Sequence, residues 1–265
     1  MKKSILRYSV QLADSLPVHP LLQRIYAARG LHSEEELQLD FSSLKVFPPD
    51  KILNMEQAVN LLCTALSERW RILVMGDFDV DGATSCALAV RAFRAMGAFW
   101  VDYCVPNRLK HGYGLTPEIV AVAAQKKPDL LVTVDNGISS YEGVKAAQSL
   151  GIKILITDHH LPGETLPDAD VIINPKQLGD DFPSKNLAGV GVIFYVMIAL
   201  RKRLREVGWF EKLNLEEPNL AQFLDLVAVG TIADVAKLDY LNRILVKNGL
   251  ERIRKKKVLR GFLWS

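Results

Sequence analysis

Short apolar segments alternate with segments of helical periodicity through the middle of this chain. The apolar segments are nearly continuous runs of Val, Ile and Leu, which is typical of strands buried on both faces. The sequence therefore predicts an α/β fold: a parallel β-sheet flanked by helices, with right-handed crossovers. The expected strands are Ile72–Met75, Trp100–Val105, Leu130–Val134, Lys153–Thr157 and Val171–Ile173. The expected helices are Met55–Arg69, Ala83–Met96, Pro117–Gln125, Tyr141–Leu150, Leu187–Val207 and Leu220–Val229.

Composition narrows the class of protein. The chain has 265 residues, of which 49% are hydrophobic, enough for one large domain or two small ones with a buried core. Its net charge of +3 neither requires nor excludes nucleic acid. The three cysteines lack metal-type spacing, which indicates reduced thiols and a cytoplasmic protein. The N-terminus has no signal-peptide pattern, and the longest apolar run, Leu187–Leu200, is too short to cross a bilayer, so no membrane association is expected.

Three aspartates, Asp77, Asp79 and Asp81, follow the first expected strand at alternate positions. On extended backbone, side chains two residues apart share a face and lie about 6.6 Å apart. Like charges so close repel one another, and bound cations relieve the repulsion; two divalent ions about 3.5–4 Å apart occur in phosphatases and nucleases. Asp81 is also expected to be the N-cap of the following helix. A plain polar loop with a capping residue is the alternative, and it leaves Asp77 and Asp79 unexplained.

The other expected strands also end in polar residues. Asp135 follows the third strand, Asp158, His159 and His160 follow the fourth, and Arg108 lies just beyond the second. In an open α/β sheet, ligands bind outside the carboxyl ends of the strands. One such ending is ordinary, and a lone histidine is more often structural than a ligand. The coincidence of these endings predicts a site at this edge of the sheet.

The types of ligand indicate which metal binds. Carboxylates with one or two imidazoles and no thiolate favour hard or borderline ions, so we expect Mn²⁺ or Mg²⁺, with zinc less favoured. One imidazole could bind metal while the other faces a substrate phosphate. Asp158 could orient an imidazole by accepting its ring N–H.

Four segments together resemble the motifs of the DHH phosphoesterases: residues 76–82, 134–137, 158–160 and 230–235. Two more, residues 106–115 and 186–191, are similar to the RecJ branch of that family, the bacterial single-strand-specific exonucleases. No single motif is decisive, but four in order with their linking segments are very specific. The resemblance extends over nearly the whole chain.

The resemblance implies a phosphodiesterase with two metal ions, in which Asp135 bridges both. Its implied ligands are Asp79 for one ion and Asp81, His159 and Asp234 for the other, with Asp77 bound to the first ion directly or through water. The implied catalytic residues are His160, which contacts the scissile phosphate or supports the site, Asp158, and Arg108 as a phosphate clamp. Asp234 is preferred to Asp225 because it fits the family's Gly-x-x-x-Asp spacing. Tyr113 is either a base-stacking residue or a packed turn residue.

As for function, the resemblance implies hydrolysis of single-stranded DNA from the 5′ end in repair and recombination, with single-strand-binding protein and a helicase as partners. One alternative is a phosphodiesterase of short oligonucleotides or cyclic dinucleotides. The similarity of residues 106–115 to the RecJ branch argues against this alternative. Another is a catalytically silent binding scaffold, or a catalytically weak truncated fragment.

The resemblance also suggests a division of the chain. Residues 1–54 are expected to form a helical lead-in, residues 55–240 the DHH catalytic domain and residues 241–265 the start of a linking helix. Family members continue into a DHH-associated domain and an OB-type domain, so the expectation is a truncated chain with weak, strongly salt-dependent substrate binding. The basic residues near the C-terminus are expected mainly to face solvent.

Overall fold

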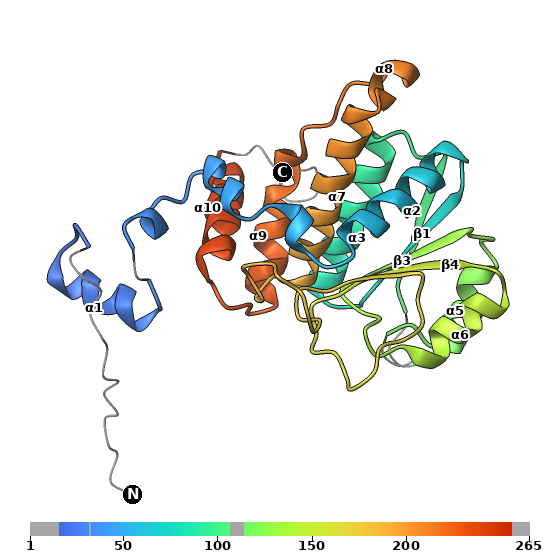
Figure 1. The fold of residues 1–265 in the computed structure, drawn as a ribbon, viewed down its shortest axis with the longest axis horizontal. Coiled ribbons are helices and arrows are strands. Elements are labelled where there is room, and N and C mark those ends of the chain that lie inside the picture. Colours follow the sequence, from blue (N-terminus) through green and yellow to red (C-terminus); the bar gives the residue numbers. More distant parts are fainter. Residues whose placement is uncertain (1–15, 32, 107–113, 256–265) are drawn as a thin grey trace, which may run out of the picture.

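A five-stranded parallel sheet forms the centre of the protein (Figure 1). The computed structural model describes residues 16–31, 33–106 and 114–255. The strands are β1 Arg71–Gly76, β2 Trp100–Cys104, β3 Leu130–Val134, β4 Lys153–Thr157 and β5 Val171–Ile173. They lie in the order β2-β1-β3-β4-β5, with every neighbouring pair parallel. This confirms the expected fold class and the expected strands to within one or two residues.

The register of the strands positions the site. Gly76 at the end of β1 pairs with Val134 at the end of β3, and Val134 pairs with Thr157 at the end of β4. Three neighbouring strands therefore end level with one another. The residues that follow them must begin side by side.

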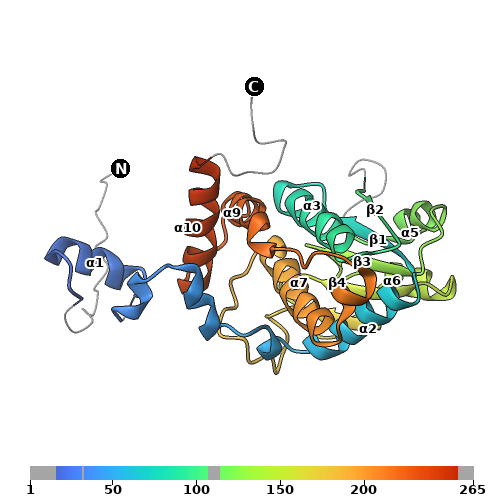
Figure 2. The same ribbon diagram turned by 90° about the horizontal axis from the view of Figure 1, so that it is seen from above.

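Helices cover both faces of the sheet because successive side chains of a strand point to opposite faces. Ile72 and Val74 pack with the helices of one layer, whereas Leu73 and Met75 pack with the other. The first layer contains α2 Met55–Ser67, α3 Val80–Ala95 and α7 Gly189–Glu206. The second contains α5 Pro117–Ala124 and α6 Tyr141–Ser149 (Figure 2).

The C-terminal part of the described chain is helical. It comprises α8 Trp209–Leu213, the 3-10 helix η4 Leu220–Phe223, α9 Leu224–Ala233 and α10 Tyr240–Arg254. Helix α9 packs against α3, α7 and α10, and so connects this part to the first helical layer. None of the helices in the described ranges is long and apolar enough to cross a bilayer.

The N-terminal lead-in is helical and extends away from the sheet (Figures 1 and 2). It contains α1 Pro20–Ala28 and the 3-10 helices η1 Glu35–Leu37, η2 Phe41–Val46 and η3 Pro49–Lys51. The Tyr240 hydroxyl donates to the carbonyls of Glu35 and Gln38, at 2.9 and 3.0 Å. These bonds tie the lead-in to the start of α10.

The start of α3 differs from the expectation. Asp79, not Asp81, is the N-cap: its backbone is extended and its Oδ1 accepts from the N–H of Gly82 at 2.8 Å. The helix begins at Val80, and Gly82 in its first turn lies close to Asp77, whose carbonyl oxygen would be 2.6 Å from an added Cβ. Asp81 therefore lies in the first turn, and its carboxylate is free to make contacts elsewhere.

Candidate metal centre

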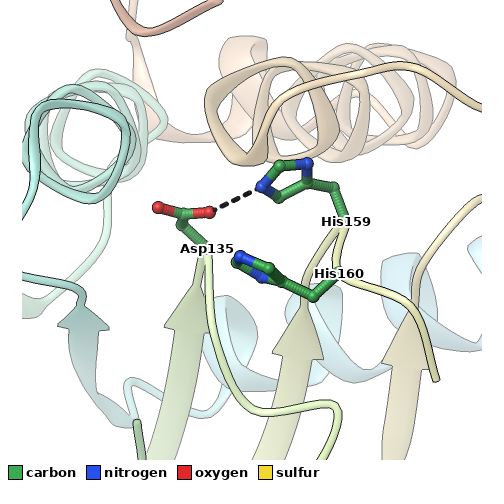
Figure 3. A group of neighbouring side chains, drawn as sticks. All are labelled: Asp135, His159 and His160. Atoms are coloured by element: carbon green, nitrogen blue, oxygen red, sulfur yellow. Dashed lines mark ion pairs between the residues drawn. The ribbon is translucent and has the colours of Figure 1, made fainter. Parts of the chain in front are cut away.

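Acidic and histidine side chains converge at the carboxyl edge of the sheet. They form three sets, and within each set the ligand atoms all lie within 4.8 Å of one another. The sets are Asp77, Asp79 and Asp135; Asp81, His159 and Asp234; and Asp135, His159 and His160. Asp135 belongs to two of the sets and lies opposite the two histidines (Figure 3). The fold thus brings together all six residues that the resemblance implies as metal ligands. It brings His160 to the same place.

Asp135 turns the chain at the end of β3. Its φ of 64° lies in the left-handed region, which Asp and Asn tolerate better than most residues. The neighbouring Asn136 holds this turn, since its Nδ2 donates to the carbonyl of Met75 on β1 at 3.2 Å and to that of Val134 at 2.9 Å. Thr133 adds a hydroxyl bond to the carbonyl of Asn136 at 2.7 Å. Asn136 received no role in the sequence analysis, although it stands beside Asp135 in the matching motif.

Asp81 is held by the N-terminus of α7. Its Oδ2 accepts from the N–H of Gly189 at 2.6 Å and its Oδ1 from the N–H of Val190 at 2.9 Å. These donors are first-turn N–H groups that have no partner within their own helix, and the positive end of the helix dipole favours the carboxylate. Gly189 is required by the close approach, because an added Cβ would lie 2.5 Å from the Cβ of Asp135. Residues 186–191 contained the signal for this contact, but no role was inferred from it.

His159 points its Nε2 atom at three carboxylates. The atom lies 3.0 Å from Oδ1 of Asp135, 3.8 Å from Oδ2 of Asp81 and 3.9 Å from Oδ1 of Asp234. Burial, aided by the charge of His160, lowers the pKa of His159, so its ring is neutral at pH 7. Within the described ranges, neither this Nε2 nor the Oδ1 of Asp135 has a hydrogen-bond partner of proper geometry. A neutral imidazole lone pair and buried carboxylate oxygens that face one another fit a divalent cation.

Asp158 has a different role from the other aspartates. It belongs to none of the three sets of ligand atoms, and it is buried. Its Oδ1 accepts from the backbone N–H groups of His159 and His160 at 2.7 and 3.1 Å, and its Oδ2 accepts from the N–H of Ile138 at 2.9 Å. Its Oδ1 also bonds Nδ1 of His160 at 2.7 Å. Asp158 therefore fixes the orientation of the His160 ring.

Asp158 and His160 carry opposite charges at neutral pH. The hydrogen bond to Asp158 raises the pKa of His160 to about 9, so the half-exposed imidazole is protonated at pH 7. Burial raises the pKa of Asp158, but the hydrogen bond and charge of His160 lower it further, and the net pKa lies below its ordinary value. A positive charge is thus held at the rim of a carboxylate cluster.

Two carboxylates of the cluster are forced toward the protonated state. Burial, followed by the charge of Asp135, raises the pKa of Asp81 to about 7. Burial, followed by the charge of Asp79, raises the pKa of Asp135 to about 8. Both groups would ionise fully if a cation stood between them, as ligands of a divalent metal must.

These pKa values predict how the stability of the metal-free protein depends on pH. Each folded pKa lies above the ordinary value of 3.8. The stability contributed by the protonated forms of Asp81 and Asp135 is therefore fully present below about pH 4, and it is lost as the pH rises toward 8. The rise in the pKa of Asp81 from 3.8 to about 7 corresponds to a change of roughly 4 kcal/mol in the free energy of unfolding. We expect the melting temperature in EDTA to decrease as the pH is raised from about 5 to about 8. Scanning calorimetry measures it, and a melting temperature that rises over this range would contradict the assignment.

Asp225, the aspartate that was set aside in favour of Asp234, is not part of the cluster. Asp225 lies in the first turn of α9, fully buried, and is in none of the three sets, whereas Asp234 at the end of α9 is in one. Arg108 and Tyr113 lie outside the described residues.

Comparisons with known proteins agree with this geometry. The chain is 54% identical over 246 residues to the single-stranded-DNA-specific exonuclease RecJ of Escherichia coli K12, a match that covers 93% of this chain and 42% of that protein. A crystal structure of Thermus thermophilus RecJ in complex with Mn²⁺ is 35% identical, with a TM-score of 0.67, over 87% of this chain and 31% of that one. The same protein in complex with Mg²⁺ matches with 32% identity and a TM-score of 0.58, over 90% of this chain and 28% of that one.

The chain therefore spans less than half the length of this curated relative, the Escherichia coli protein. The family model described as the DHH family, N-terminal domain, matches residues 71–231. These limits run from the first residue of β1 into α9, and they include every residue of the three ligand sets except Asp234. With most of its length matched by this model, the chain belongs to the DHH family.

Proposed function

We propose that this chain is the catalytic part of a metal-dependent exonuclease that degrades single-stranded DNA in the 5′ to 3′ direction. The observation that carries the proposal is that the set of Asp77, Asp79 and Asp135 adjoins the set of Asp81, His159 and Asp234, with Nε2 of His159 only 3.0 Å from Oδ1 of Asp135. Two adjacent cation sites suit phosphodiester hydrolysis. The names of the relatives, single-stranded-DNA-specific exonucleases, support the substrate. The separate complexes of a RecJ with Mn²⁺ and with Mg²⁺ support the proposal that both bound ions are Mn²⁺ or Mg²⁺.

The proposed ligands divide between the two ions according to the sets of nearby atoms. Asp77 and Asp79 would hold one ion together with Asp135, which would also be shared with the other because its Oδ1 lies 3.0 Å from Nε2 of His159. Asp81, His159 and Asp234 hold the second ion. When bound, such ions lower the pKa of an attacking water and neutralise charge on the leaving oxygen.

The remaining proposed roles belong to groups that contact the phosphate. The protonated His160 donates a hydrogen bond to a non-bridging phosphate oxygen, and Asp158 keeps the ring turned toward it. Arg108 remains our proposed phosphate clamp on the grounds of its guanidinium fork and its place after β2 in the chain.

The test is degradation of a 5′-labelled single strand in Mn²⁺, in Mg²⁺ and in EDTA. We expect metal-dependent release of short 5′ products, with about a thousandfold less product for Asp135→Asn, because loss of an ion removes several kcal/mol of stabilisation. A 3′-labelled strand reports the polarity. Hydrolysis of dinucleotides without degradation of longer strands would instead favour a phosphodiesterase of very short substrates.

We further propose that the protein works in the cytoplasm, in DNA repair and recombination, beside single-strand-binding protein and a helicase. The free state of its three cysteines is ordinary in a reducing compartment. A helicase and a single-strand-binding protein produce and cover the strands that such a nuclease would degrade. In this proposal residues 55–240 are the catalytic domain, residues 1–54 a lead-in, and residues 241–265 the start of a linking helix.

A further inference from the structure

Val235, which directly follows Asp234, adopts an unusual backbone conformation. Its φ is 56°, in the left-handed region that a β-branched residue rarely enters. Its N–H donates to the carbonyl of Ile232 and the N–H of Ala236 donates to that of Thr231, both at 3.2 Å. This pair of bonds is the Schellman motif, whose left-handed position is usually glycine. Val235 thus ends α9 where a glycine would be less strained.

Folding gives no reason for a valine at this position. The side chain is 86% exposed, so it gains little from burial, and the backbone disfavours it. Among the described non-glycine residues with positive φ, Val235 alone is β-branched. Strain of this kind gathers at functional sites.

Two more exposed apolar residues directly follow a residue of the candidate metal centre, as Val235 does. Val80 directly follows Asp79 and is 47% exposed, and Leu161 directly follows His160 and is 78% exposed. We call Val80, Leu161 and Val235 the apolar rim. Each Cα of the rim lies about 3.8 Å from the Cα of a residue of the centre, because they are bonded neighbours. Three separate segments of the chain thus each have an exposed apolar residue directly after a residue of the ligand sets.

We propose that the apolar rim contacts the sugar and base faces of the nucleotides that flank the bound phosphodiester, with Val235 as a main contact. This inference rests on the proposed function, in which the scissile phosphate lies on the metal centre. A nucleoside is larger than the step from one residue to the next, so a nucleoside beside the bound phosphate is large enough to reach the residues bonded to those of the centre. Its apolar side chains add binding that releases no counterions and so does not depend on salt.

The experiment compares Val235→Gly and Val235→Asn with the wild type. Both replacements tolerate positive φ and both remove the apolar side chain. Lys127→Gly is the matched control: Lys127 also has positive φ, 50°, but its carbonyl accepts from the side chain of Arg71 at the start of β1, the opposite edge of the sheet. Binding of a fluorescent oligothymidylate is measured by anisotropy in Mn²⁺ over a range of salt concentrations, and cleavage is followed separately.

For Val235→Gly we expect a melting temperature raised by about 2 °C through relief of strain, and an oligothymidylate Kd raised about 5-fold. Val235→Asn is expected to weaken binding similarly. The slope of log Kd against log salt and the calorimetric Mn²⁺ affinity should stay as in the wild type, because neither a phosphate contact nor a metal ligand is lost. Lys127→Gly should raise the melting temperature without changing the Kd.

Several results would overturn the inference. One is a Kd for Val235→Gly within about twofold of the wild type; another is a salt slope reduced by about one, the sign of a lost phosphate contact. A lower melting temperature for Val235→Gly would show that the side chain serves the fold, and self-association abolished by this variant would show a protein interface. A wild type that binds the strand but cleaves nothing would count against the proposed function alone, while the Kd values would still decide the role of Val235.

Discussion

The Asp135→Asn variant is expected to lose binding of divalent cations and, without metal, to be more stable than the wild type at neutral pH. The pKa of Asp135 is about 8, so at pH 7 its burial and its neighbours already oppose ionisation. An amide carries no charge and can donate to the neutral Nε2 of His159, 3.0 Å from Oδ1 of the present carboxylate. Asn also tolerates the φ of 64° at this position. We expect roughly 2–4 kcal/mol of added stability, or about 5–10 °C.

Calorimetric titration with Mn²⁺ and thermal unfolding in EDTA measure the two effects of Asp135→Asn. Asp135→Ala is the matched control: it also removes the carboxylate, but it lacks the amide donor and Ala is less suited to the left-handed backbone. The alanine variant should lose the metal without the full gain in stability. Undiminished Mn²⁺ affinity in Asp135→Asn would show that Asp135 does not bridge the ions.

The Gly189→Ala variant is expected to damage both the fold and the centre, although residue 189 has no side chain. An added Cβ would lie 2.5 Å from the Cβ of Asp135 and 2.7 Å from its Oδ1, so α7 must move away. That movement stretches the bonds from the N–H groups of Gly189 and Val190 to Asp81. Overpacking of this kind costs about 1–3 kcal/mol, and the lost charge-assisted bonds add to it. We expect stability to fall by about 3 kcal/mol and the affinity for Mn²⁺ to fall at least about 10-fold.

Gly191→Ala provides the comparison on the same turn of α7. The three atoms nearest its added Cβ all belong to the side chain of Leu187, and the closest, at 2.8 Å, is Cδ2 at the end of that side chain rather than backbone. Denaturant unfolding and Mn²⁺ titration of both variants should show a small loss for Gly191→Ala and a large one for Gly189→Ala. Equal losses in the two variants would mean that the approach of α7 to Asp81 and Asp135 is not critical.

The sequence determined the sheet and the residues at its edge. Apolar runs such as Leu130–Val134 predict buried strands from composition alone, because their β-branched and aliphatic side chains suit both faces of a covered sheet. Parallel strands then place the residues after them along one edge, which brings Asp77 and Asp135 together without further information. The match of ordered motifs to the DHH family depended on the same local residues.

Only the tertiary structure decided how these residues are held. Asp81 was expected to cap its own helix, yet its carboxylate is bound by backbone N–H groups 108 and 109 residues later in the chain. The distance from His159 to Asp234 likewise depends on how α9 packs against α3 and α7. Local patterns report only on neighbours within a few positions, because strand and helix periods repeat over two to four residues. A bond between distant segments depends instead on which faces pack together, and that is settled when the whole core closes.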